Sequence, residues 1–75
     1  MLATDDIYEL LILIDVDLKH QFDNAYNLND VQQLRGVQRK LLDMRNYNNN
    51  NYIIINAIKK IDDFIFEEYE YNYNK

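Results

Sequence analysis

The feature that most constrains this chain is its lack of chain breakers: it has no proline and one glycine, Gly36, in 75 residues. With so few of these residues, long helices are the favoured local structure. Asparagine must then supply the breaks, because its short amide side chain competes for backbone hydrogen bonds. Two asparagine-rich clusters, residues 24–29 and 46–51, divide the sequence into three segments. We expect both clusters to be loops between helices.

The first segment predicts a helix over about residues 5–22. Its apolar side chains recur at steps of three or four, the period of one helix face: Ile7, Leu11, Ile14, Leu18 and Phe22. Asp6 and Glu9 stand in capping-box spacing near its start. A second interpretation stays open for residues 10–18, because an apolar run that leads into an alternating one is equally typical of a buried strand. A strand would need neighbours, and no second segment has that pattern.

The other two segments predict helices over about residues 30–45 and 51–70. Both carry one apolar stripe at helical spacing: Val31, Leu34, Val37, Leu41 and Met44 in the first, and Ile54, Ala57, Ile58, Ile61, Phe64 and Ile65 in the second. Asn29 with Gln32 predicts a cap for the first, and Asn50 or Asn51 a cap for the second. Gly36 costs the helix about 1 kcal/mol relative to alanine. It is either a tolerated surface glycine or a place where a neighbouring helix or a ligand comes close.

These stripes predict an all-α fold for residues 1–75, a small three-helix bundle or helical assembly in one domain. A chain this short buries only about 60% of the surface that its unfolded form exposes. The sequence has no cysteine, so disulfides cannot compensate for the small core. Oligomerisation is therefore one way in which the core would be completed.

Charge and composition narrow the classes of partner. The net charge of −5 argues against nucleic acid or an anionic membrane as the main partner. An acidic opening, and an apolar run of only five residues from Leu10 to Ile14, indicate no signal peptide and no transmembrane segment. We therefore expect an intracellular protein. Residue types with AT-rich codons make up 37 of the 75 residues, which favours a virus, phage or mobile element as the source.

Catalytic motifs are few. A hydrophobic strand that ends in Asp15-Val16-Asp17 resembles the first motif of haloacid-dehalogenase phosphatases, in which paired carboxylates hold magnesium. No small hydroxyl residue follows, the rest of the chain is too short for a doubly wound fold, and in a helix the two aspartates would point apart. The sequence has neither serine nor cysteine, and His20 has no nucleophile to activate. We expect no enzyme activity, no cofactor and no metal site.

The remaining candidates are two surfaces. The C-terminal segment is acidic and rich in tyrosine, a composition typical of protein-binding surfaces: its candidate contacts are Glu67, Glu68, Tyr69, Glu70, Tyr71 and Tyr73, with residues 69–75 as a tail. The middle helix is basic, and Arg35, Arg39, Lys40 and Arg45 would contact nucleic acid or an acidic partner.

We therefore expect a small acidic interaction module, plausible as a viral or phage accessory protein that inhibits a larger host or viral protein with a basic surface. The first alternative is a structural subunit of a homo-oligomer, a virion or a complex. The second is a nucleic-acid-binding regulator that uses the basic middle helix.

Overall fold

The computed structural model describes residues 4–47 and 51–70, and these form four α-helices and one π-helical turn. No described residue lies in a strand, so the all-α prediction is confirmed and the strand interpretation of residues 10–18 is wrong. The elements in chain order are α1 (Thr4–Ile14), α2 (Val16–Asn27), α3 (Val31–Tyr47), α4 (Tyr52–Ile65) and the turn η1 (Phe66–Glu70).

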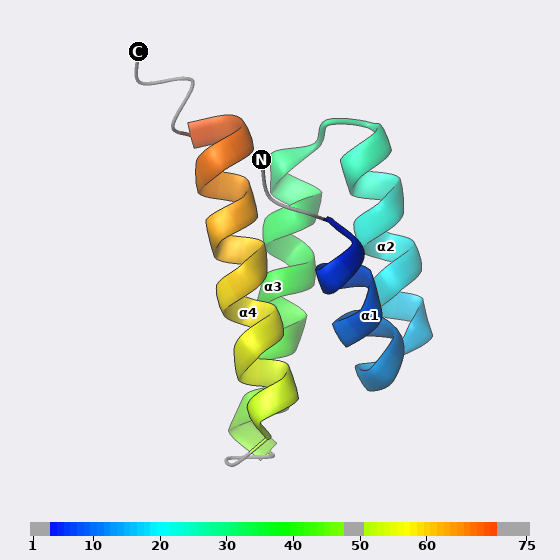
Figure 1. Ribbon diagram of the computed structural model, residues 1–75, viewed down its shortest axis with the longest axis vertical. Coiled ribbons are helices and arrows are strands. Elements are labelled where there is room, and N and C mark those ends of the chain that lie inside the picture. The colour runs from blue at the N-terminus through cyan, green and yellow to red at the C-terminus, as the bar shows by residue number, and fades with distance from the viewer. Residues whose placement is uncertain (1–3, 48–50, 71–75) are drawn as a thin grey trace.

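The four helices run up and down in turn (Figure 1). Helix α1 packs against α2 and α4, and α3 packs against the same two helices from the other side. The connection between α1 and α2, the end of α3 and the start of α4 lie at one end of the bundle, whereas the α2–α3 connection and η1 lie at the other (Figure 1). The molecule therefore has two ends of different composition.

The predicted helix over residues 5–22 is two helices, because the chain breaks at Asp15. The Asp15 backbone is extended (φ −168°, ψ 116°), and its side chain accepts a hydrogen bond from the backbone N–H of Asp17. Asp15 thus caps α2, while its own N–H donates to the Leu11 carbonyl and closes the last turn of α1. A one-residue break keeps the apolar stripes of both halves on the inside, so periodicity did not reveal it.

The first asparagine cluster is mostly helical rather than a loop. Helix α2 continues to Asn27, and only residues 28–30 connect it to α3. Asn29 takes a left-handed conformation (φ 54°), which asparagine tolerates better than most residues. The cap of α3 is Asp30, whose side chain accepts a hydrogen bond from the N–H of Gln33 at 3.1 Å. The predicted cap, Asn29, is one residue too early.

The second cluster agrees better with the prediction. Asn51 caps α4 by accepting hydrogen bonds from the N–H groups of Ile53 and Ile54. Helix α3 extends to Tyr47, two residues past its predicted end, and residues 48–50 lie outside the described ranges. The predicted third helix changes from α to π geometry after Ile65, and its described part ends at Glu70.

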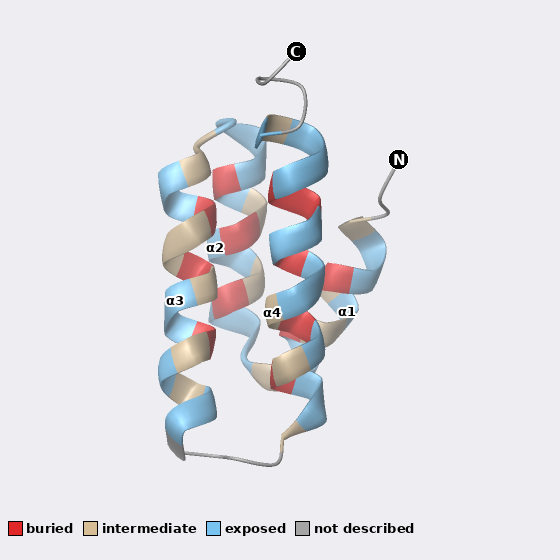
Figure 2. Ribbon diagram, turned by 90° about the vertical axis from the view of Figure 1, so that its left-hand side faces the viewer, coloured by how far each residue is buried: buried red, intermediate tan, exposed pale blue. Residues whose placement is uncertain are grey.

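The core is the set of apolar stripes on the inward helix faces (Figure 2). The fully buried side chains are Ile7, Leu11, Leu18, Phe22, Ala25, Leu34, Val37, Leu41, Ile54, Ala57, Ile61, Phe64 and Ile65. Most of the predicted stripe residues are in this set, and Ile14, Val31, Met44 and Ile58 pack half-buried against it. No described polar side chain is buried, so the bundle interior is purely apolar.

Candidate functional site

The part of the acidic tyrosine tail that the structure describes packs against the bundle. The half-buried Tyr69 ring meets Phe64 edge-on, with centroids 6.1 Å apart. Its hydroxyl donates to the side-chain oxygen of Asn29 at 3.4 Å, and burial raises the pKa of Tyr69. Two further candidate contacts, Tyr71 and Tyr73, lie outside the described residues. Tyr69 therefore holds η1 to the bundle.

Glu70, a candidate of the acidic surface, pairs with Arg35, a candidate of the basic surface. The Arg35 guanidinium also forms an ion pair with Asp62 at 2.9 Å and donates to the side chain of Gln38 at 2.9 Å. We call Arg35, Gln38, Asp62 and Glu70 the Arg35 cluster. Three of the five guanidinium N–H donors can be satisfied within it, so the two predicted surfaces neutralise each other here.

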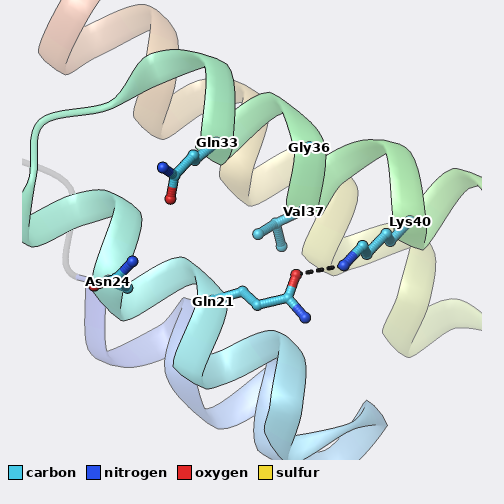
Figure 3. Close-up of a pocket in the computed structure, with 6 residues that line it drawn as sticks. All are labelled: Gln21, Asn24, Gln33, Gly36, Val37 and Lys40. Carbon is cyan, nitrogen blue, oxygen red and sulfur yellow. Dashed lines mark hydrogen bonds between the residues drawn. The ribbon is translucent and has the colours of Figure 1, made fainter.

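Arg39 lies one helical turn after Arg35 in α3, but Lys40 and Arg45 lie on other faces of the helix. Lys40 faces α2, where its ammonium donates to the side-chain oxygen of Gln21 at 2.7 Å (Figure 3). Arg39 and Arg45 are exposed, and neither forms an ion pair within residues 4–47 and 51–70. Phosphate binding gains from several cations along one face, but Arg39 and Arg45 are six positions apart and lie on different faces of α3.

Gly36 lies at a groove between α2 and α3 (Figure 3). A Cβ atom added there would meet no other atom within 4 Å, so the close helix approach considered for Gly36 is not found. The groove has a volume of about 230 Å³ and is lined by Gln21, Asn24, Gln33, Gly36, Val37 and Lys40. Its polar side chains are all exposed, so it offers a ligand no buried polar group.

Asp15 and Asp17 do not converge on a cation site. Both are exposed, and the Asp15 carboxylate is engaged as the cap of α2. Within the described residues, no three histidine, aspartate or glutamate side chains lie close enough to hold a metal ion. His20 is an exposed residue of α2.

An aromatic network links three helices to η1. Phe64 of α4 contacts Phe22 and Tyr26 of α2, with centroids 5.7 and 5.6 Å away, besides Tyr69. Tyr8 of α1 meets Phe22 edge-on. Its hydroxyl donates to Asp23 at 2.8 Å, and burial, then this bond to a carboxylate, raise the Tyr8 pKa. This network fixes α1 against α2.

The surface that sequence reasoning missed lies where α1 meets α2. Ile12, Leu13 and Val16 are 53%, 70% and 51% exposed, and we call these three residues the corner patch. Five consecutive apolar residues, Leu10 to Ile14, surround a helix on every side, so one stripe cannot bury them all. This run could have predicted the exposed patch. If residues 10–14 are helical and Leu11 and Ile14 face the core, residues 12 and 13 must face solvent.

Three exposed carboxylates lie close in the sequence to the corner patch. Glu9 lies one helical turn before Ile12 and Leu13, and Asp15 and Asp17 flank Val16, all three exposed. We call Glu9, Asp15 and Asp17 the acidic rim. Helices α1 and α2 with Asp15 hold six carboxylates and one lysine. That lysine, Lys19, lies over the Tyr8 ring, 5.5 Å from its centroid, so this face of the bundle is strongly negative.

Comparison with known proteins gives a short answer. No family model, curated protein or solved structure matches this chain. In addition, none of the helices within residues 4–47 and 51–70 combines the length and the apolar character needed to cross a membrane. The function is therefore argued from the surfaces described above.

Proposed function

We propose that this protein is a non-enzymatic protein-interaction module that binds its partner through the corner patch. The observation that carries the proposal is the exposure of Ile12, Leu13 and Val16, each more than half open to solvent within five consecutive residues. Covering three such side chains would contribute on the order of 5 kcal/mol to binding, before the entropic costs of association.

The corner patch is also held in place. The Asp15 cap and the N–H of Asp15 fix the joint between the helices, and the Tyr8 bond to Asp23 ties α1 to α2 about two helical turns away from it. A preorganised patch loses little conformational entropy when a partner covers it. These features favour the corner over the tail, because Tyr69 and Glu70 already have partners within the chain.

Binding is a better proposal than catalysis. The sequence has no serine or cysteine, and Thr4 is its only aliphatic hydroxyl. The one groove described above is open and has no buried polar group that would orient a reacting molecule. That the partner is a larger host or viral protein, inhibited by this one, stays a hypothesis from composition.

Site-specific photo-crosslinking tests the proposal. A benzophenone side chain replaces Leu13 in one variant, Leu28 in a second and Glu68 in a third, and each is irradiated in a lysate of the cells that produce the protein. Leu28 is the matched control, since it is 61% exposed but lies at the other end of the bundle. We expect a discrete adduct at position 13 that excess unlabelled protein removes and that excess Leu13→Ser protein does not.

Other outcomes separate the alternatives. An adduct at position 68 alone would move the site to the acidic tail, and no adduct at any position would contradict a binding function. An adduct with the mass of two copies would favour the structural subunit. The nucleic-acid regulator is tested by mobility shifts at about 50 mM salt, where counterion release most favours binding through Arg39 and Arg45.

A further inference from the structure

We infer that the partner element at the corner patch is a basic amphipathic helix, an inference that rests on the proposed function and names its partner class. Two observations meet at this place: three exposed apolar side chains, and three exposed carboxylates one helical turn before them or next to them in the sequence. The complementary surface has apolar side chains flanked by lysine or arginine.

The partner must bind through side chains. Every described residue near the patch is helical apart from Asp15, and helices have no free strand edge to which an extended peptide could add a strand. The backbone at Asp15 is itself engaged, through its N–H to Leu11 and its carbonyl to Leu18. Apolar side chains on helices are ordinarily covered by another helix, which presents its own at spacings of three and four.

The partner must be basic. The acidic rim of Glu9, Asp15 and Asp17 has no described cation paired to it, whereas the nearby Asp6 pairs with Lys60 at 3.8 Å. Lysine or arginine side chains beside the apolar stripe of a partner helix would supply the missing charge. Opposite charge also speeds association at low ionic strength.

The same rim argues against the other occupants. A symmetric contact with a second copy would place the patch against itself and bring Glu9, Asp15 and Asp17 of both copies together. Such like charges oppose association. An anionic lipid surface would be repelled in the same way. The basic helix remains the occupant for which both the apolar patch and the rim are favourable.

The test uses two synthetic helical peptides of about 18 residues with the same leucine stripe. One carries lysine on its polar face and the other glutamate. Binding to the intact protein is measured by titration calorimetry at about 50 and 300 mM salt, and ¹⁵N chemical-shift changes map the contact. We expect the lysine peptide to bind at least about tenfold more tightly, to weaken as salt rises, and to shift residues 9–17.

Matched variants distinguish an effect of the corner patch from an effect of the protein's net charge. Glu9→Gln and Glu68→Gln change the net charge equally, and both residues are exposed, but they lie in α1 and in η1. Leu13→Ser and Leu28→Ser remove the same exposed side chain from opposite ends of the bundle. We expect Leu13→Ser to weaken the lysine peptide about tenfold, since a covered leucine is worth about 1.5 to 3 kcal/mol. Glu9→Gln should weaken it about threefold, and both control variants less than twofold.

The outcomes also separate this inference from the proposed function. Equal binding of the two peptides, or equal effects of Glu9→Gln and Glu68→Gln, would refute a basic partner while an adduct at position 13 still supported the binding function. Equal effects of Leu13→Ser and Leu28→Ser would refute the corner as the peptide site. Circular dichroism of each variant confirms that the substitutions leave the bundle folded, as expected for exposed positions.

Discussion

The two ends of the bundle differ in whether their aromatic, charged and apolar side chains have partners within the chain. At the end that holds η1, Phe64 meets three aromatic rings and Arg35 meets two carboxylates, so groups that look available in the sequence are bonded to each other. At the α1–α2 corner, three apolar side chains remain more than half exposed. An aromatic or charged segment is therefore a candidate interface only where the rest of the chain leaves it unpartnered.

The largest expected contrast between the ends is in stability. Phe64→Ala removes the centre of the aromatic network and leaves a cavity, which should lower the free energy of unfolding by about 3 to 5 kcal/mol. Leu13→Ala, at the open corner, should lower it by less than about 0.5 kcal/mol, because the side chain is mostly in solvent already. Urea unfolding followed by circular dichroism gives both values.

Because a loss of that size can unfold a small domain, Phe64→Leu is the second variant. It should lose about 1 kcal/mol, an amount that an unfolding curve resolves. If Leu13→Ala were as costly as Phe64→Leu, Leu13 would be buried in solution, and the corner patch would not exist as a free surface.

Substitutions of Tyr69 test whether its ring is packed against the bundle at the η1 end. Tyr69→Ala removes a half-buried ring from Phe64 and should cost about 1 to 2 kcal/mol of unfolding free energy. Tyr69→Phe keeps the ring and loses only the long hydroxyl contact to Asn29, so it should be nearly neutral in urea unfolding. A neutral Tyr69→Ala would mean that the ring is free to meet a partner, as its composition predicts.

The helix faces could be predicted from the sequence, and so could the Asn51 cap of α4, whereas the helix ends at Asp15 and Asp30 could not. Ile7, Leu11, Leu18 and Phe22 are buried as predicted, because apolar period reports which side of a helix faces the core. The spacing of apolar residues is the same whether residues 5–22 form one long helix or two short helices joined at a single residue. Asp15 was the missing signal: aspartate is a strong cap, yet it stood inside the predicted helix over residues 5–22, where no cap was expected.

Asp15 therefore gives the next test, at the open corner. Asp15→Ala removes the cap of α2 and should cost about 1 kcal/mol, while Asp15→Asn keeps an equivalent acceptor and should cost a few tenths at most. Urea unfolding compares the two. If one continuous helix ran through this position, Asp15→Ala would stabilise the protein instead, because alanine is the better residue inside a helix.

The candidate site was harder to predict than the fold. Glu70 and Arg35 are 35 positions apart in the sequence, and each looked like part of a separate surface until the fold brought them together. Conversely, Leu13 was assigned to neither predicted surface, because it sits in an apolar run. Composition shows which residue types a chain has, but only the packing decides which of them remain for a partner.

The smallest expected effect is the coupling between Arg35 and Glu70. It measures how strongly the ion pair at the η1 end of the bundle holds these two side chains together. A double-mutant cycle of Arg35→Met and Glu70→Gln should give a coupling of about 0.2 to 1 kcal/mol, since both side chains are partly exposed. The coupling should shrink as salt is raised, through screening. The same cycle with Glu68→Gln in place of Glu70→Gln is the control, with an expected coupling near zero. If the Glu70 cycle were also zero at low salt, Glu70 would be as free as the acidic rim, and both ends of the bundle would then offer carboxylates to a basic partner.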